Sequence, residues 1–270
     1  MPELPEVETT RRGIAPHLEG RRVTDVVVRQ ARLRRPVPDH LPATLAGQRL
    51  TEVARRGKYL RLCFPAGELI LHLGMSGSLR VLPADTPAGP HDHVDLCFEG
   101  GRVLRLHDPR RFGLVDWQPP GTVHPWLAHL GPEPLGPDFH GAWLAERARG
   151  RRQAVKAFLM DSKVVVGVGN IYASEALFRA GIHPARAAGR IARARWEHLA
   201  EAVRAVLAEA IEQGGTTLRD FTRADGRPGY FAQSLAVYGR AGAPCPRCGT
   251  AIRRRVLGGR ASYYCPACQR

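Results

Sequence analysis

Four cysteines near the end of the chain have the spacing of a metal site. Cys245 and Cys248 form one Cys-x-x-Cys pair, Cys265 and Cys268 form a second, and sixteen residues separate the two pairs. Each pair brings two thiolates to one tight turn, and two such turns complete the tetrahedron that Zn²⁺ prefers. Because all four ligands come from the protein, we expect one structural zinc ion rather than a catalytic one. Two disulfides are the alternative that this spacing leaves open.

The segment between the two cysteine pairs is basic and predicts a small β-hairpin. It reads AIRRRVLGGRASYY, with strand-like runs on both sides of Gly258-Gly259. A hairpin of this size has no core of its own, so the metal supplies its folding free energy. We expect it to contact the phosphates or a groove of a nucleic acid, although modules of this kind also occur in transcription and translation proteins. Its arginines are Arg253, Arg254, Arg255 and Arg260.

A glycine-rich segment, VVVGVGNIYASEA, predicts a helix that is capped by Asn170. We exclude a dinucleotide site, because Tyr172 stands where that motif needs glycine or alanine. The bare amides of the helix start and the Asn170 side chain form a place for one phosphate, and an ordinary N-cap is the alternative. The motif by itself favours the ordinary N-cap, and three cations on the preceding predicted helix make the phosphate site a competing interpretation: Arg151, Arg152 and Lys156.

Two apolar residues lie in loops that are rich in glycine or arginine. Met75 is part of HLGMSGS, and Phe112 follows two arginines in HDPRRFG. Exposed apolar side chains of a basic protein can enter a base stack and unstack one step, and burial in the core is the alternative. His91 and His93, in PHDHVD, lack the partners of a zinc site. They are candidates for phosphate contacts or ordinary polar residues at a strand end.

The elements that position these residues fall into two parts. A helix is predicted over residues 5–18, because Pro5 suits a first turn and the apolar residues share one face. Short alternating runs follow, including DHVDLCF and RVLRLHD on either side of Gly100-Gly101. These patterns predict that residues 1 to about 130 form an antiparallel β domain, which we expect to be a sandwich.

The second part of the chain is predicted to be helical. The Pro- and Gly-rich run 129–141 indicates a domain boundary, and helices are predicted near 154–159, from 170 to Gly181 and over 196–213. The polar run GGTTLRDFTRADGRPGY then indicates a mobile loop. We place an N-terminal domain at 1–132, a linker at 133–150, a helical domain at 151–235 and the zinc finger at 236–270.

The charge balance favours a polyanionic partner. The 270 residues include 40 Lys and Arg against 25 Asp and Glu, which gives a net charge of +15. Nucleic acid is the first such partner, and a compositional bias towards arginine is the alternative. No apolar run reaches the ~18 residues of a membrane span and no signal peptide is recognisable. We therefore expect a soluble intracellular protein in which Cys63 and Cys97 are reduced core residues.

The motifs of the chain, taken in order, resemble one family. PELPEVE, HLGMSGSL, HDHVDL, DPRRFG, LGPEPL, LMDSKVVVGVGNIYASE, QGGTTL, PGYFAQ, YGR and the two-CxxC hairpin resemble bacterial formamidopyrimidine-DNA glycosylase, also called 8-oxoguanine DNA glycosylase. The resemblance covers essentially the whole chain. It implies an α+β fold of two domains: an N-terminal antiparallel β-sandwich with flanking helices, and a C-terminal helix–two-turn–helix domain with a zinc β-hairpin finger.

The resemblance also implies an enzyme with two activities, a DNA glycosylase for 8-oxoguanine and formamidopyrimidines and an AP lyase that cuts by β,δ-elimination. Removal of Met1 would free the secondary amine of Pro2, and a free α-amine titrates near pH 8, so part of it is neutral at working pH. This amine would attack the sugar C1′, with Glu3 as acid and base. Lys58 would assist proton transfer and hold a phosphate. Arg260 matches a catalytic arginine that serves as an acid in the elimination, and above all it would grip the phosphates that flank the extruded nucleotide, because an arginine barely deprotonates.

Other roles implied by the resemblance concern DNA contacts. His91, Arg110, Arg151, Lys156 and Asn170 match DNA-binding positions, and Met75, Arg110 and Phe112 match residues that fill the void left by the extruded base. The loop that begins Thr216, Thr217, Leu218, Arg219, Asp220 and Phe221 would close over the lesion. Glu6 and Glu175 match carboxylates near the amine, and for both we expect structural support.

Three alternatives remain open. An endonuclease VIII type would favour oxidised pyrimidines, but Leu4 and the HLGMSGSLR run favour the purine enzyme. A zinc-finger DNA-binding protein without chemistry would have no need of Pro2 and Glu3. A basic RNA-associated protein would have no use for a proline at position 2. We expect a monomer that acts on damaged double-stranded DNA in the bacterial cytoplasm, with zinc as its cofactor and no membrane partner.

Overall fold

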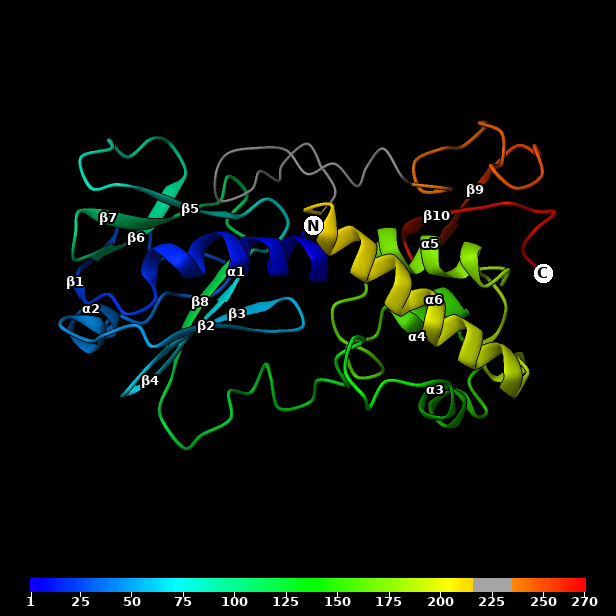
Figure 1. Cartoon of the computed structure of the whole chain (residues 1–270), viewed down its shortest axis with the longest axis horizontal. Helices are drawn as coiled ribbons and strands as arrows, with labels where there is room; N and C mark the ends of the chain where they lie inside the picture. The colour runs from blue at the N-terminus through cyan, green and yellow to red at the C-terminus, as the bar shows by residue number, and fades with distance from the viewer. Residues whose placement is uncertain (216–234) are drawn as a thin grey trace. The chain divides into compact units, whose positions relative to one another are not determined.

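The computed structural model describes residues 1–215 and 235–270, which form two compact units (Figure 1). The first unit contains Met1–Ala128 and residues 213–215, and the second contains His129–Glu212 and residues 235–270. The chain passes from the first unit to the second at the start of the Pro- and Gly-rich run 129–141. Such a run forms neither helix nor strand readily, so it suits a connection between units.

The first unit is built on two four-stranded antiparallel sheets, as the alternating runs predicted. One sheet has the order β1-β6-β7-β5 and the other has the order β2-β3-β4-β8. Strand β3 shows the reason, because its residues are alternately buried and partly exposed, and the buried ones enter the core. The strands are β1 Val23–Val28, β2 Glu52–Arg56, β3 Tyr59–Phe64, β4 Gly67–His72, β5 Ser78–Pro83, β6 Asp92–Phe98, β7 Arg102–His107 and β8 Leu114–Gln118.

Helix α1 (Leu4–Leu18) contacts both sheets of the first unit, through β2 and β3 on one and β5 on the other (Figure 1). Its buried residues include Val7, Ile14 and Leu18, the face that the sequence predicted. Pro5 lies in the first turn, as expected, and Glu3 and Glu6 form a capping box at the helix start. The unit also contains one short helix that we did not predict, α2 (Leu41–Leu45).

The second unit is helical, with the long helix α6 (Arg193–Glu212) packed against α3 (Gly141–Ala148) and α5 (Asn170–Arg179). The apolar stripe predicted for α6 is buried: Trp196, Leu199, Val203, Val206, Leu207, Ala210 and Ile211. Helix α4 (Val155–Leu159) packs against α5, and η1 (Ala188–Arg190) lies beside α3. Helix α3 forms within residues that we had assigned to a linker, because Leu144 and Ala148 are buried in this unit.

The zinc-finger hairpin consists of β9 (Arg253–Leu257) and β10 (Arg260–Tyr264), paired antiparallel. Gly258 and Gly259 form its two-residue turn with φ of +54° and +74°, a conformation that glycine adopts at little cost. A small cluster of buried residues attaches the finger to α5, through Phe178 packed with Val237 and Ile252. The predicted hairpin is therefore confirmed, and it belongs to the same compact unit as the helices.

The two cysteines outside the finger lie on strands of the first unit. Cys63 and Cys97 are free but half-buried, so the expectation that they are core residues was wrong. Cys63 lies on the outward-facing side of the alternating strand β3. Burial raises the pKa of Cys63 to about 11, so it is a thiol at neutral pH. Across residues 1–215 and 235–270, no helix combines the length and the apolar character needed to cross a membrane.

Candidate active site and DNA-contact residues

The N-terminus lies at the start of α1 and beside a pocket. Pro2 and Glu3 are buried, whereas Met1 is 42% exposed. The backbone N–H of Glu3 donates to Oε2 of Glu6 at 2.8 Å, which holds the first residues against the helix. A pocket of about 380 Å³ opens next to Met1. It is lined by Met1, Arg34, His72, Gly74, Met75 and Phe112.

His72 is a pocket residue that the sequence analysis missed. It ends β4, its ring lies 4.9 Å from that of Tyr59, and its Nδ1 accepts a hydrogen bond from the backbone of Gly74 at 3.0 Å. Burial, assisted by the charges of Lys58 and Arg34, lowers the pKa of His72 to about 4. The ring is therefore neutral at pH 7, with its proton on Nε2. The signal in the sequence was a polar residue two positions before a glycine, Gly74, at the end of a strand-like run.

Lys58 lies next to this pocket. It stands in the turn between β2 and β3, where Arg56 pairs with Tyr59. The neighbouring Tyr59 pairs with His72 on β4, and the Lys58 charge acts on that imidazole. Antiparallel pairing of three strands thus brings a lysine predicted to be catalytic towards the pocket that contains Met1.

Met75 and Phe112, the residues predicted to enter a base stack and here called the wedge residues, lie on the surface. Met75 is 37% exposed and Phe112 is 42% exposed, so the alternative that places them in the core is wrong. The guanidinium carbon of Arg110 lies 5.0 Å from the centre of the Phe112 ring, which is the distance of a cation–π contact. Met75 and Phe112 line the same pocket as Met1. The structure therefore brings together the N-terminus and two loops that are more than 35 residues apart in sequence.

The two histidines of PHDHVD differ in their surroundings. His93 is buried, and its Nε2 lies 2.8 Å from the carbonyl oxygen of Asp108. His91 is exposed and has a φ of +71°. A positive φ is uncommon outside glycine, although histidine adopts it more often than most residues do. Only His91 is therefore accessible to a ligand such as a phosphate.

In the second unit, Lys156 connects the start of α5 with the zinc finger. Lys156 is 2% exposed, and its Nζ donates to Oδ1 of Asn170 at 2.6 Å, to the carbonyl of Ala261 at 2.9 Å and to Oγ of Ser262 at 2.8 Å. These bonds match the three N–H donors of an ammonium group. Ala261 follows Arg260, so Lys156 links Asn170 to the strand that carries this arginine.

The predicted N-cap role of Asn170 was wrong. Gly169 is the N-cap residue of α5, and Asn170 is the first helical residue. Its side-chain oxygen is bonded to Lys156, and its Nδ2 donates to Oη of Tyr238 at 3.3 Å. Arg151 and Arg152 also differ from expectation, because both precede α4 instead of lying on it, and both are exposed.

Glu175 holds the chain segment 236–238 against α5. Its carboxylate accepts three backbone N–H bonds: from Ala236 at 2.8 Å, Val237 at 3.0 Å and Tyr238 at 2.8 Å. This arrangement places the Tyr238 hydroxyl beside Asn170. Glu175 therefore has the structural role that we expected for it.

The predicted lesion-loop residues, from Thr216 to Phe221, lie outside the described residues.

The four cysteines form a compact cluster whose ligand atoms all lie within 4.8 Å of one another. The sulfur distances are 3.9 Å for Cys245–Cys268, 3.5 Å for Cys248–Cys265 and 3.4 Å for Cys248–Cys268. A tetrahedron with Zn–S bonds of about 2.3 Å would space its sulfurs about 3.8 Å apart, so the cluster fits one zinc ion. All four are free cysteines, which excludes the disulfide alternative. The zinc is structural, because four protein sulfurs complete its coordination.

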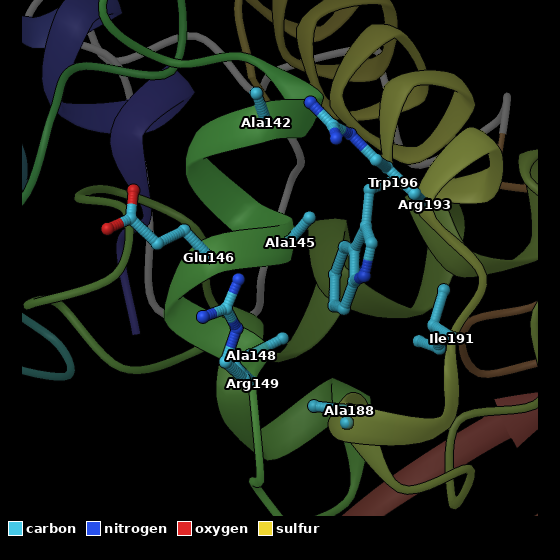
Figure 2. A pocket seen from close by; sticks show the side chains of 10 residues that line it. Ala142, Ala145, Glu146, Ala148, Arg149, Ala188, Ile191, Arg193 and Trp196 are labelled. Carbon is cyan, nitrogen blue, oxygen red and sulfur yellow. The ribbon is translucent and has the colours of Figure 1, made fainter.

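A second pocket, of about 420 Å³, lies in the helical unit between α3, η1 and the start of α6 (Figure 2). Alanines of α3 form one wall and Trp196 lies opposite them, with Arg149 and Arg193 at the edges (Figure 2). None of the residues that line it belongs to the predicted site. The pocket that contains Met1 is thus the better candidate for an active site.

Comparisons with known proteins match every part of the chain. Family models match residues 1–115 as the formamidopyrimidine-DNA glycosylase N-terminal domain, 130–222 as its H2TH domain, and 242–270 as a zinc finger found in FPG and IleRS. The formamidopyrimidine-DNA glycosylase of Alkalilimnicola ehrlichii is 64% identical over all of both chains.

Solved structures agree with these matches. The crystal structure of the MutM (Fpg) protein of Thermus thermophilus is 43% identical, with a TM-score of 0.90 over 99% of this chain and 98% of that one. A complex of Lactococcus lactis Fpg with DNA containing Fapy-dG is 32% identical, with a TM-score of 0.91 over 99% of this chain and 100% of that one.

Proposed function

The chain belongs to the formamidopyrimidine-DNA glycosylase family, and we propose that it excises oxidised purines from double-stranded DNA and then cuts the abasic strand. The observation that carries this proposal is one pocket lined both by the N-terminal residue and by the exposed residues Met75 and Phe112. A nucleophile and a wedge are what an enzyme needs to act on a base that it extrudes from the duplex.

The nucleophile is the amine of Pro2, which becomes free when Met1 is removed. The buried Pro2 directly precedes Glu3, the N-cap residue of α1, so this amine lies near the positive end of the helix dipole. The positive field of the helix end favours the neutral amine that attacks C1′. As the bond between nitrogen and C1′ forms, the bond between C1′ and the damaged base breaks, and the base leaves with a proton. Opening of the sugar ring then gives an iminium ion on Pro2.

The iminium ion provides the second activity. Its positive charge withdraws electrons and acidifies the proton on C2′, so loss of that proton expels the 3′ phosphate, and δ-elimination then expels the 5′ phosphate. Glu3 protonates the sugar ring oxygen and transfers protons in these steps. Lys58 assists these transfers and holds a phosphate of the strand. The neutral His72 offers its Nε2–H to the same region of the substrate.

The wedge residues hold open the place from which the base is extruded. Extrusion of a nucleotide costs a few kcal/mol of stacking and pairing, and an inserted apolar side chain offsets part of that cost. Met75 and Phe112 enter the gap, while Arg110, stacked on Phe112, contacts the DNA strand opposite. His91 contacts a phosphate nearby. Thr216, Thr217, Leu218, Arg219, Asp220 and Phe221 begin the loop that covers the damaged base.

The helical unit and its finger bind the DNA backbone. Asn170, Arg151 and Arg260 contact phosphates around the extruded nucleotide, and Lys156 holds Asn170 in position. Zinc keeps Arg260 on a rigid hairpin. Most of the binding free energy comes from phosphate contacts, so affinity falls as salt rises. We propose that the protein acts as a monomer in the cytoplasm.

Trapping of the iminium ion tests the mechanism. Borohydride added to protein and a duplex that contains 8-oxoguanine opposite cytosine should reduce the iminium ion and leave a covalent adduct. Mass spectrometry of the same sample must first establish that Met1 has been removed. Correctly processed protein that forms no adduct would sink the proposal. Faster cleavage of thymine glycol than of 8-oxoguanine would favour the endonuclease VIII alternative instead.

A further inference from the structure

Asp108 joins the two loops that carry the exposed apolar residues. We propose that Asp108 is a positioning residue that holds Met75 and Phe112 at the separation needed to enter a base stack. This inference rests on the proposed function, because it assigns a source of order to the wedge. Asp108 itself is fully buried, at 0% exposure, so it does not contact DNA.

The carboxylate of Asp108 makes one hydrogen bond to each loop. Its Oδ1 accepts from the hydroxyl of Ser76 at 3.0 Å, and its Oδ2 accepts from the backbone N–H of Gly113 at 2.7 Å. Ser76 follows Met75, and Gly113 follows Phe112. Each oxygen therefore fixes the chain one residue away from a wedge side chain. A single carboxylate spans two loops that the sequence separates by more than 30 residues.

The backbone of Asp108 ties in a third segment. Its N–H donates to the carbonyl of His91 at 2.9 Å, and its carbonyl oxygen lies 2.8 Å from Nε2 of His93. The same carbonyl accepts from the N–H of Arg111 at 3.1 Å. The segment that presents His91, a proposed phosphate contact, is thus attached to the residue that connects the wedge loops.

The loops also pack without spare room. A Cβ atom added to Gly74 would lie 2.4 Å from the carbonyl carbon of Phe112, so only glycine allows this approach. Arg111 and His91 have φ of +56° and +71°. Left-handed conformations of such residues are unfavourable and persist only where the surroundings hold them. The bonds to Asp108 fasten both residues, which explains how this local conformation is maintained.

The partners of Asp108 are neutral groups. Within residues 1–215 and 235–270, no ion pair of this carboxylate falls within 4 Å. Burial of a carboxylate without a cation is costly, so a role in stability alone is a poor reason to keep it. Directional bonds to both loops are what an aspartate provides here and what an apolar residue of similar size would lack.

The test compares Asp108→Ala with two other variants. Asp108→Asn should preserve function, because its amide can accept from the Gly113 N–H and donate to the Ser76 hydroxyl. Asp95→Ala is the matched control, since Asp95 is a buried carboxylate of the same unit that pairs with Arg105 and Arg29, away from the wedge loops. It should lower the melting temperature without changing the wedge.

Three measurements separate positioning from general damage. They are the single-turnover excision of 8-oxoguanine, the fluorescence of a 2-aminopurine beside the lesion as a report of unstacking, and the cleavage of a duplex with a preformed abasic site. For Asp108→Ala we expect excision and the unstacking rate to fall about tenfold or more, because small misplacements of a positioned group have effects of this size. Cleavage at the abasic site should stay within about twofold, because no base has to be extruded there.

Several results of these measurements would each overturn the positioning role of Asp108. Normal unstacking and excision by Asp108→Ala would overturn the inference, as would an equal loss of excision and abasic-site cleavage. A loss of unstacking in Asp95→Ala equal to that in Asp108→Ala would also overturn it, since the effect would then follow stability. If Asp108→Asn failed like Asp108→Ala, hydrogen bonding would not be the cause. Failure of the proposed function is recognised separately, because wild-type protein would then form no borohydride adduct with either duplex.

Discussion

The ammonium of Lys156 lies 2.6 Å from the side-chain oxygen of Asn170, and both groups belong to the helical unit. The same ammonium donates to Ser262 on the zinc finger. One buried cation therefore connects the start of α5 with β10, which carries Arg260. This geometry suggests that Lys156 acts on DNA binding through its neighbours.

Replacement of Lys156 by methionine should weaken DNA binding without changing how steeply the affinity depends on salt. A lysine that positions Asn170 neutralises no phosphate, so its loss releases no fewer counterions. Arg260→Ala is the control, and it should lower the salt slope by about 0.9, as expected for one phosphate contact. Fluorescence anisotropy at several salt concentrations measures both slopes. A drop of the same size for Lys156→Met would mean that the lysine contacts a phosphate itself.

Removal of zinc should unfold the finger and leave the first unit intact. The four cysteines hold a hairpin with a very small core, so the metal provides most of its stability. We expect Cys268→Ala, or treatment with a strong chelator, to reduce DNA affinity by at least about a hundredfold through loss of the finger's phosphate contacts. Zinc content, DNA binding and the β-sheet signal in circular dichroism are the measurements. Tight binding by metal-free protein would contradict this role of the finger.

Protonation of Glu8 should make the protein less stable as the pH falls. Burial tends to raise its pKa, but hydrogen bonds from Arg11, Arg12 and Arg55 lower the pKa to about 2. Because the folded pKa lies below the ordinary value near 4.5, this stabilisation is present above pH 4.5 and is lost as the pH falls towards 2. At pH 7, Glu8→Gln should lower the free energy of unfolding by about 2–3 kcal/mol.

Urea unfolding at pH 7 and at pH 3 measures this effect. The control is Glu99→Gln, which changes an exposed glutamate and should alter stability by less than about 0.5 kcal/mol. The difference between Glu8→Gln and wild type should shrink at pH 3. An unchanged difference at pH 3 would show that the arginines are not responsible.

His72 should stay neutral well below the usual pH of histidine titration. Its pKa is lowered to about 4 by burial and by the charges of Lys58 and Arg34. The unfolded chain takes up this proton near pH 6.5 and the folded chain does not, so stability is lost as the pH falls from about 6.5 to 4. An NMR titration of the His72 ring should give a midpoint near 4. A midpoint near 6.5 would show that the pocket leaves the imidazole hydrated.

Much of the architecture could be predicted because it depends on neighbours in sequence. The stripe of α6, the hairpin turn at Gly258-Gly259 and the spacing of the cysteines each involve residues within about one turn or one hairpin. Strand β8 could not be predicted in this way. Its five residues form a strand because they pair with β4, more than 40 residues earlier in the chain. The start of α5 was misassigned because the oxygen of Asn170 is taken by Lys156.

The sequence by itself determined the fold class, the zinc ligands and, through its resemblance to a family, the residues proposed for chemistry. Local patterns and side-chain types are enough for these, since periodicity, turns and ligand spacing act over short distances. Only the tertiary structure decided that Met75 and Phe112 are exposed beside the N-terminus, and that His72 lines the same pocket. It also revealed that Asp108 joins their loops. A polar side chain can bond to any suitable partner, and the packing of distant segments alone selects which one it meets.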